Sequence, residues 1–544
     1  MSFLIVSFGQ SSWIPFCGIG AAAIGYACFW NAMLRLFSTT LARFWLSVGW
    51  FALVQAVQLS WLTSTQYMGP LILVVYGILI FLIGLQFGSL VFFFRGTSIS
   101  LQNCFALSGC WVILEWLRTF FFTGFTWNPV GLALADTSYA IQLASLLGVY
   151  GLSFWVIFVN SLALYVLEKF RKFKDKKQPL IWISLACFPY LFGFCQIAWV
   201  EKNVPIEKVY SIALVQTAIL PEQKDRLNNQ LEDFIPPLNQ WERIWECLEG
   251  AKNLDFIILP EAAVSLSAYR PFYPIDLLKK VWGLYFGKQS LEDLPSLTPP
   301  FAVLGEYRGE KVFKVSNAFI AQAMANHFKS NVIAGFDDQD ESLKYNAAFC
   351  FKPNNVPVER YEKRILVPIG EYTPFSQFRW VSDFLSREFG IGDSFDIGAE
   401  AKIFSTETPV GVSICLEETY SHLIRDLRLS GARLFINISN DIWFPHSRLP
   451  EHHFQHGKIR AVENGVCVLR SCNTGITGAI DCCGRVVQTL IPSEKEAGIL
   501  TLSMPVRSFK TLYTWWGNLP ILLMSFFFFG YIFRKYGKQE ALSQ

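Results

Sequence analysis

Long apolar stretches in the first 200 residues constrain this chain more than any other feature. A membrane-spanning helix needs about 20 consecutive, mainly apolar residues, and this part of the chain contains several such segments with few charges. Residues 3–31 are interrupted between Gln10 and Pro15, so they form either two short spans or one broken span. Further spans are predicted at residues 44–63, 70–94, 103–122, 143–167, 180–199 and 518–533. We therefore expect a multi-span helical bundle in the membrane.

Composition separates this membrane part from a polar part. Hydrophobic residues make up 52% of the 544 residues and charged residues only 16%, which is typical of a membrane protein. Charges become evenly spaced after Val200. We predict an N-terminal bundle of about seven spans at 1–200, a second domain at 201–505, and a C-terminal helix with its tail at 506–544. The net charge of +3 argues against nucleic acid as a partner.

The cysteines and histidines do not form the spacing of a metal site. The 13 cysteines are scattered, without a CxxC pair, so we expect free thiols, no metal and no cofactor. In "HHFQH", His453 and His456 lie near one face of a predicted helix, which offers a metal site as the weaker alternative to a structural role.

The basic residues between the spans predict the orientation of the bundle. If the chain crosses the membrane at each predicted span, the basic positions share one side: Arg35, Arg43, Arg95, residues 168–177 and residues 534–538. Lys and Arg are enriched in cytoplasmic loops. The domain after Val200 is therefore expected on the opposite, extracytoplasmic side.

Strands and helices alternate in the polar domain. Short β-branched runs such as "SIALVQ", "FIILPE", "SNVIAGF", "VGVSIC" and "RLFINIS" are separated by helical segments, including one predicted at 417–431. This alternation predicts an α/β fold with strands buried on both faces, in which functional residues usually follow the ends of strands. Glu261, Lys363 and Cys415 occupy such positions. Together they supply a base, a cation and a nucleophile, which are the groups that acyl transfer needs.

The motifs around these residues resemble a known family. The order of "LPE", "KRILVPIGEY" and "SICLE" is similar to that of the nitrilase superfamily, with its αββα sandwich and Glu-Lys-Cys triad. The segments "WVILEWLR", "TGFTWNPVG", "LLGVYGLSF", "SNDIWFPHS", "KIRAVENGVCVLRSCNTGITGAID" and "TLYTWWGNLP" resemble the integral-membrane branch of that superfamily, the apolipoprotein N-acyltransferases. The resemblance covers nearly the whole chain.

This resemblance implies a ping-pong reaction in the bacterial inner membrane, with the polar domain on the periplasmic side. Cys415 is expected to take an acyl chain from a phospholipid as a thioester, with Glu261 as general base and Lys363 stabilising the thiolate and the oxyanion. The α-amine of the diacylglyceryl cysteine of an apolipoprotein then accepts the chain. Glu371 and Glu417 are expected to support the site. Glu371 would orient Lys363, and Glu417 would either support the site or only cap the following helix.

Further residues are candidates for binding substrate. The resemblance assigns this role to Asn440, Trp443 and Trp127. Glu115 and Arg118 lie within one helical turn of a predicted span, where lone charges are costly. They form either a structural ion pair or a site for a lipid headgroup.

The chain departs from the family pattern close to the nucleophile and in two long segments. Leu416 stands where the family usually has Tyr, and Thr217 and Ala218 follow the first strand in place of Gly and Asn. Residues 269–300 are interpreted as an insertion, either an interfacial arm or a loop packed on the domain. Residues 380–392 are interpreted as a lid.

Two other functions are compatible with the motifs. A membrane-tethered nitrilase-type amidase would share the triad and would hydrolyse small amides without phospholipid. A transporter or scaffold with a degenerate nitrilase fold would not need Cys415.

Overall fold

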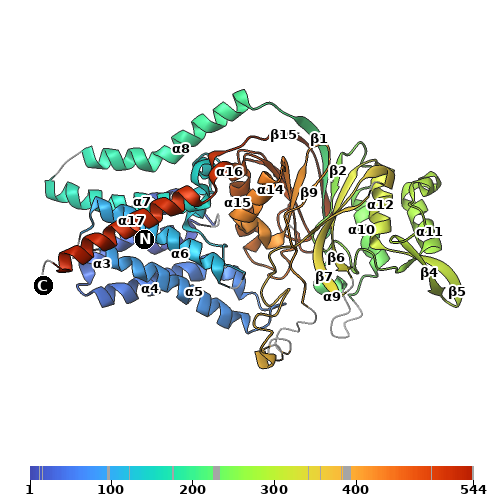
Figure 1. The fold of residues 1–544 in the computed structure, drawn as a ribbon, viewed down its shortest axis with the longest axis horizontal. Coiled ribbons are helices and arrows are strands. Elements are labelled where there is room, and N and C mark those ends of the chain that lie inside the picture. Colours follow the sequence, from blue (N-terminus) through green and yellow to red (C-terminus); the bar gives the residue numbers. More distant parts are fainter. Residues whose placement is uncertain are drawn as a thin grey trace.

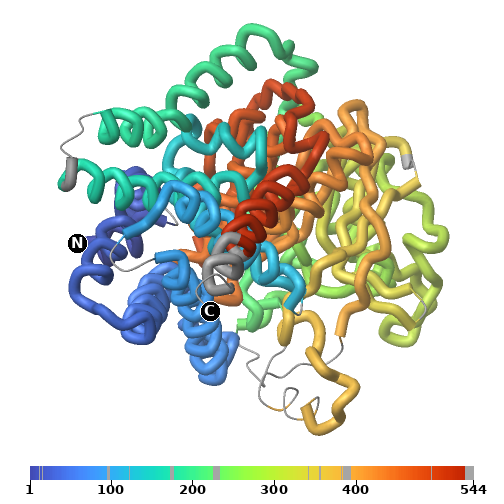
Figure 2. Tube along the Cα trace, turned by 60° about the vertical axis from the view of Figure 1, so that its left-hand side comes forward, coloured from blue at the N-terminus to red at the C-terminus, as the bar shows by residue number. Residues whose placement is uncertain are grey.

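A bundle of helices forms one end of the molecule and a β-rich domain forms the other (Figure 1). The computed structural model describes residues 1–541 apart from 11–12, 15, 95–97, 122, 174–176, 225–232, 341, 356, 382, 384–386, 388–393 and 492. Both chain termini lie at the bundle end, as the turned view in Figure 2 also shows. The predicted combination of a membrane bundle and an α/β domain is confirmed.

The bundle is built of helices, and most of the spans predicted from the sequence coincide with long apolar helices, except those at 103–122 and 518–533. Its elements are α1 (Ser2–Phe8), α2 (Cys17–Gly20), η1 (Ala21–Gly25), α3 (Tyr26–Leu36), α4 (Thr40–Gln58), η2 (Ser60–Thr63), α5 (Ile72–Ser89), η3 (Leu90–Phe93), α6 (Leu101–Leu117), η4 (Arg118–Phe120), η5 (Val130–Leu134), η6 (Ala140–Leu143), α7 (Ala144–Phe173), α8 (Lys177–Asn203), α16 (Leu512–Trp516) and α17 (Leu519–Ala541). Among the described residues, five helices are long and apolar enough to cross a membrane. They are Cys17–Leu36, Thr40–Gln58, Ile72–Phe93, Ala140–Arg171 and Lys177–Asn203.

Small residues bring helices of the bundle close together. A Cβ atom added at Gly109 of α6 would lie 2.9 Å from the backbone of Ser525 in α17. Such close approach of backbones is typical of helix packing in membranes. It joins the C-terminal helix to the N-terminal bundle, although more than three-quarters of the chain separates them.

The ends of α3, α7 and α17 lie at the end of the bundle away from the polar domain (Figure 1). Arg171 at the end of α7 donates to Asn31 of α3 at 3.3 Å, and the nearby Glu168 accepts from the N–H of Ile99 at 3.4 Å. The starts of α4 and α8 lie at this same end (Figure 1). The orientation of the bundle in a membrane stays a prediction. Arg95, also used in that prediction, lies outside the described residues.

The polar domain is built on two sheets of six strands each, counted over the described residues. The first has the order β15-β1-β2-β6-β7-β8 and the second β14-β13-β12-β11-β10-β9. The strands of the first sheet are β1 (Lys208–Gln216), β2 (Phe256–Ile258), β6 (Asn331–Asp340), β7 (Leu343–Phe351), β8 (Glu359–Glu362) and β15 (Gly498–Val506). Those of the second are β9 (Ile403–Phe404), β10 (Val410–Ile414), β11 (Leu434–Ser439), β12 (Cys467–Cys472), β13 (Gly478–Ile480) and β14 (Val486–Thr489).

Helices cover the outer face of each sheet, as expected for an αββα sandwich. Helices α10 (Pro237–Cys247) and α12 (Asn317–Phe328) share a buried apolar cluster with the first sheet. Helices α14 (Ser421–Leu429) and α15 (Leu449–Asn464) pack on the second sheet, and a further cluster fills the space between the sheets. Because both faces of the central strands are buried, their sequences are continuously apolar rather than alternating. Helix α15 also lies against the bundle (Figure 1).

Three expectations about the polar domain need correction or remain outside the structure. Residues 269–300 form β3 (Tyr273–Pro274), α11 (Ile275–Phe286) and η7 (Lys288–Asp293). They lie at the end farthest from the bundle (Figure 1), and Trp282 packs on Trp245 of α10 at 5.3 Å. The prediction of an interfacial arm is therefore wrong, and the alternative, a segment packed on the domain, is correct.

The helix expected at 417–431 begins as the 3-10 helix η9 (Cys415–Thr419), and α14 starts only at Ser421. The proposed lid at 380–392 falls mainly outside the described residues.

Candidate active site

Glu261, Lys363 and Cys415 follow the ends of three strands and meet at one place. Glu261 comes three residues after β2, Lys363 directly follows β8, and Cys415 directly follows β10. The first two strands belong to one sheet and the third to the other, so the residues converge where the two sheets face each other. The structure thus brings together the base, cation and nucleophile candidates.

Two carboxylates hold the Lys363 ammonium. Lys363 Nζ donates to Glu261 Oε1 at 2.9 Å and to Glu371 Oε1 at 2.8 Å. The side chain is only 1% exposed. Burial alone would lower the pKa of Lys363, but the charges of Glu261 and Glu371 outweigh it and raise the pKa well above its ordinary value. Lys363 is therefore a fixed positive charge within the site.

Asn346 of β7 joins the same two carboxylates and was not predicted. Its Nδ2 donates to Glu261 Oε1 at 2.7 Å and to Glu371 Oε1 at 2.9 Å. The second oxygen of Glu371 accepts from the N–H of Val367 at 2.8 Å. The sequence signal was weak, since Asn346 is one polar residue opening an apolar strand. The network fixes both carboxylates before any substrate binds.

Cys415 has the backbone conformation of a sharp turn between a strand and a helix. Its φ is +53°, in the left-handed region, where a non-glycine residue costs about 1–3 kcal/mol. Burial and the negative charge of Glu261 raise the pKa of the Cys415 thiol, against the opposing charge of Lys363. The resting thiol is consequently protonated, and a base must remove its proton before sulfur can attack.

Glu417 ties the segment of Lys363 to the turn of Cys415. One of its oxygens accepts from the N–H of Arg364 at 2.6 Å, and the other accepts from the N–H of Ile414 at 2.8 Å. Both are 3.0 Å from the hydroxyl of Tyr361. Glu417 is completely buried. Its carboxylate thus caps the turn and bridges the two sheets.

Ser439, Asp441 and His453 surround Cys415 on the side of β11 and α15. The Ser439 hydroxyl lowers the pKa of the Cys415 thiol, whereas the charge of Asp441 raises it, and the hydroxyl lies 3.4 Å from Asp441 Oδ1. His453 places Nδ1 3.0 Å from Asp441 Oδ1 and Nε2 3.2 Å from the carbonyl oxygen of Cys415. Because a carbonyl only accepts, Nε2 carries a proton. Asp441 stands one side chain away from the nucleophile, which the strand-end argument did not reveal.

Trp127 lies over these histidines. Its ring packs edge-on against His453 with centroids 5.0 Å apart. Its carbonyl accepts from Nε2 of His452 at 2.6 Å and of His456 at 3.0 Å. Burial lowers the pKa of His452 to about 4 and that of His456 well below its ordinary value, so both are neutral donors. Nδ1 of His452 and of His456 has no hydrogen-bond partner among the described residues. The described residues also contain no group of three His, Cys, Asp or Glu side chains that could hold a metal ion.

Glu115 and Arg118 lie behind the nucleophile turn rather than beside the sulfur. They are 3.6 Å apart, and Glu115 also accepts from the N–H of Val130 at 2.8 Å. Both line a small cavity between the bundle and the polar domain, together with Thr419 and Arg460.

Asn440 and Trp443 occupy the loop after β11. Asn440 Oδ1 accepts from Asn473 Nδ2 at 2.9 Å, and Asn473 in turn accepts from Thr217 at 2.6 Å. Asn440 thus belongs to the hydrogen-bonded frame that Thr217 joins at the end of β1. Trp443 is 47% exposed, with Tyr67 of the bundle 6.3 Å away between ring centroids. Leu416, in place of the usual Tyr, is buried in the apolar cluster beneath α14.

Known proteins resemble the chain over both parts. Residues 211–510 match the family described as carbon-nitrogen hydrolase, and residues 4–162 match the apolipoprotein N-acyltransferase N-terminal domain. The apolipoprotein N-acyltransferase of Chlamydia pneumoniae is 29% identical to this chain and covers 97% of it and 94% of its own length. The protein of the same name from Chlamydia caviae is 29% identical, over 98% of this chain and 96% of its own length. That from Haemophilus ducreyi is 27% identical, over 97% of this chain and 94% of its own length.

Proposed function

The chain belongs to the carbon-nitrogen hydrolase family, and on that basis we propose that it is an N-acyltransferase of lipoproteins. It transfers an acyl chain from a membrane phospholipid, through a thioester on Cys415, to the α-amine of the diacylglyceryl cysteine of an apolipoprotein. The observation that carries this proposal is the convergence of Glu261 and Lys363 at Cys415 in a domain joined to the matching membrane bundle.

The first half-reaction uses all three residues. Glu261 takes the thiol proton while sulfur attacks the ester carbonyl of the phospholipid, and the C–S bond forms. The charge on the carbonyl oxygen is stabilised by Lys363 and by the N–H of Leu416, because the first N–H groups of a helix lack intrahelical partners. Collapse breaks the ester C–O bond. Protonated Glu261 returns its proton to the leaving alkoxide, and lysophospholipid departs.

The second half-reaction transfers the acyl chain from the sulfur of Cys415 to the nitrogen of the acceptor. The neutral α-amine attacks the thioester carbon, its N–C bond forms, and Glu261 accepts the proton that the nitrogen loses. The C–S bond then breaks, and the thiolate of Cys415 recovers a proton from Glu261. Glu371 and Asn346 act as positioning residues, since they hold Lys363 and Glu261 without reaching the sulfur.

The bundle supports a lipid donor and a lipid-linked acceptor. Its apolar helices would keep the chain in the bacterial inner membrane, with the polar domain on the periplasmic side, where both substrates are confined to the same leaflet. Confinement raises the effective concentration of each substrate. Exclusion of water protects the thioester from hydrolysis. Trp127, Asn440 and Trp443 are proposed to contact the substrates, and Glu115 with Arg118 to brace the bundle against the nucleophile turn.

Product analysis tests this function against the alternatives. Purified protein is mixed with a phospholipid labelled in its acyl chain and a synthetic diacylglyceryl lipopeptide. We expect N-acylated lipopeptide and lysophospholipid in equal amounts. Release of ammonia from small amides without phospholipid, and no N-acylated product, would favour the tethered amidase. Full biological function of Cys415→Ala would favour the transporter or scaffold.

A further inference from the structure

An acidic cleft opens at Asp441 and the loop after β11, on the side where the polar domain meets the bundle. It has a volume of about 520 Å³, within the range of ligand-binding clefts. Four carboxylates line it, from Asp441, Glu451, Glu494 and Glu496. Lys495 and His446 also line the cleft, and Nδ1 of His446 lies 3.2 Å from Oε2 of Glu494. The cleft therefore favours a cationic ligand.

Two of these carboxylates have a buried oxygen without a hydrogen bond. Oδ2 of Asp441 and Oε2 of Glu451 accept no hydrogen bond from any residue that the structure describes. Asp441 is only 4% exposed. A buried carboxylate oxygen without a partner is costly, so these oxygens would gain from a donor brought by a ligand.

Asp441 connects the cleft to the reacting sulfur. Its other oxygen, Oδ1, lies 3.0 Å from Nδ1 of His453, and Nε2 of the same ring lies 3.2 Å from the carbonyl oxygen of Cys415. A cationic group held at Asp441 is thus one imidazole ring away from the residue that carries the nucleophile. That is where the second substrate must arrive.

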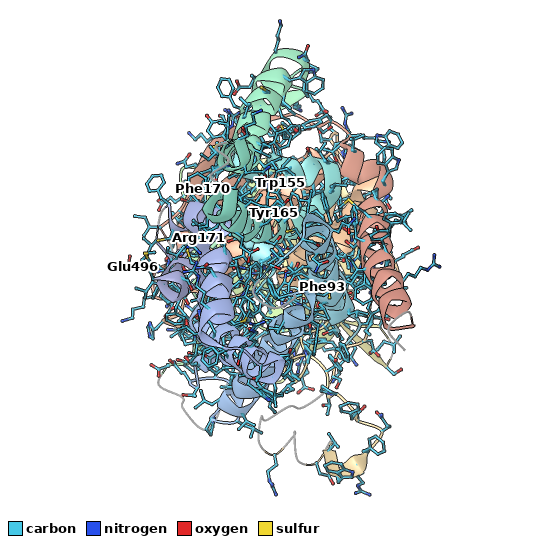
Figure 3. The ribbon with its side chains drawn as sticks, turned by 90° about the vertical axis from the view of Figure 1, so that its left-hand side faces the viewer. Phe93, Trp155, Tyr165, Phe170, Arg171 and Glu496 are labelled. Carbon is cyan, nitrogen blue, oxygen red and sulfur yellow. The ribbon has the colours of Figure 1, made fainter. Side chains whose placement is uncertain are left out.

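Part of the cleft wall contacts the bundle. Phe444 lines the cleft and packs edge-on against Trp61 of the bundle with ring centroids 4.9 Å apart. Ser64 of the bundle donates to the carbonyl of Pro445 at 3.4 Å. Glu496 lies at the outer edge of the molecule when it is viewed from the bundle end (Figure 3). The cleft thus has an aromatic residue that contacts the bundle and a carboxylate at the outer edge of the molecule.

We propose that this cleft binds the acceptor, with Asp441 holding its α-ammonium and Glu451, Glu494 and Glu496 holding basic residues of the polypeptide that follows. The inference rests on the proposed function. An α-amine has a pKa of about 7.7–8.0 and is mainly charged at neutral pH. The cleft accordingly prefers acceptors with Lys rather than Glu after the lipidated cysteine.

Binding to the inactive full-length protein tests the cleft separately from the reaction. Cys415→Ala is titrated with two diacylglyceryl lipopeptides that carry either Lys or Glu after the cysteine, in detergent at low salt. We expect the Lys peptide to bind about tenfold more tightly, with the difference shrinking as salt is added. Adding Glu451→Gln, Glu494→Gln and Glu496→Gln to Cys415→Ala should remove the preference. Equal binding of both peptides would overturn the role of these three residues.

The role of Asp441 has its own control. Adding Asp441→Asn to Cys415→Ala should weaken binding of the lipopeptide with a free α-amine and leave binding of its N-acetylated form unchanged. Equal weakening of both would show a structural effect and contradict the ammonium site. Formation of the acyl-enzyme is measured in parallel on protein with Cys415 intact. Charge-selective binding without any acyl-enzyme would support the acceptor cleft and contradict the proposed reaction. Formation of the acyl-enzyme without charge-selective binding would support the reaction and contradict the acceptor cleft.

Discussion

The ammonium of Lys363 lies 2.9 Å from Glu261 Oε1, although 102 residues separate them in the sequence. Both side chains are almost completely buried. A buried ion pair of this kind is weak support for stability, because desolvation offsets much of the attraction. Its position beside Cys415 suggests that it serves the reaction, by keeping a base and a cation at fixed places around the sulfur.

The charge of Glu261 should suppress the intrinsic reactivity of Cys415. Since Glu261 helps to raise the pKa of the thiol, Glu261→Gln should lower that pKa. Cys415 would then react faster with iodoacetamide at a given pH, while acylation by phospholipid is lost. The rate is measured between pH 7 and 10 by mass spectrometry of the Cys415 peptide, because other free cysteines are present.

Lys363→Met provides the opposite test. Lys363 lowers the pKa of the thiol, so its removal should slow alkylation and shift the profile to higher pH. If both variants changed the alkylation rate in the same direction, access rather than charge would control the thiol, and the electrostatic account would fail.

Glu371→Gln should slow acylation without unfolding the domain. Gln has no charge with which to pair Lys363. Loss of a hydrogen bond to a charged group costs about 1.5–3 kcal/mol, or roughly 10- to 100-fold in rate. The measurement is the single-turnover rate of Cys415 acylation. The control is Glu362→Gln, because Glu362 adjoins Lys363 in sequence but binds Arg360 at 2.7 Å and Lys402 at 3.1 Å. Equal losses in both variants would contradict a specific role of Glu371.

Acid should loosen the contact between Trp127 and helix α15. Burial lowers the pKa of His452 to about 4 from an ordinary value of 6.5, so the unfolded state binds a proton that the folded state does not. The stabilisation is complete above pH 6.5 and is lost as pH falls towards 4, by roughly 3 kcal/mol. Melting temperatures of wild type and His452→Gln are compared between pH 4 and 8. The wild type should lose more stability in acid, and parallel curves would contradict this assignment.

The fold was largely predictable because the signals were local. Apolar stretches of membrane-spanning length and continuous runs such as "LFINIS" correspond to the long helices and to buried strands such as β11 (Leu434–Ser439). The triad candidates could be found because functional residues follow strand ends in such folds. The start of α14 was missed because Glu417 folds back onto the N–H of Ile414, which creates a tight turn that helical periodicity does not reveal.

The surroundings of the triad could not be predicted in the same way. Asn346, Ser439 and Asp441 reach the site through pairing between distant strands and loops, and each is an ordinary polar residue in its own segment. The position of residues 269–300 was also beyond local signals. An apolar, Lys-containing segment suits a membrane surface and a protein core equally well, and only the tertiary structure decided between them.

The most direct test of the central claim is detection of an acyl group on Cys415. Purified protein is incubated with a phospholipid carrying a labelled acyl chain, without acceptor, and the label is located by mass spectrometry. We predict label on Cys415 that hydroxylamine removes, transfer of that label to an added diacylglyceryl lipopeptide, and no label in Cys415→Ala. Folded wild-type protein that acquires no label from any phospholipid would contradict the account.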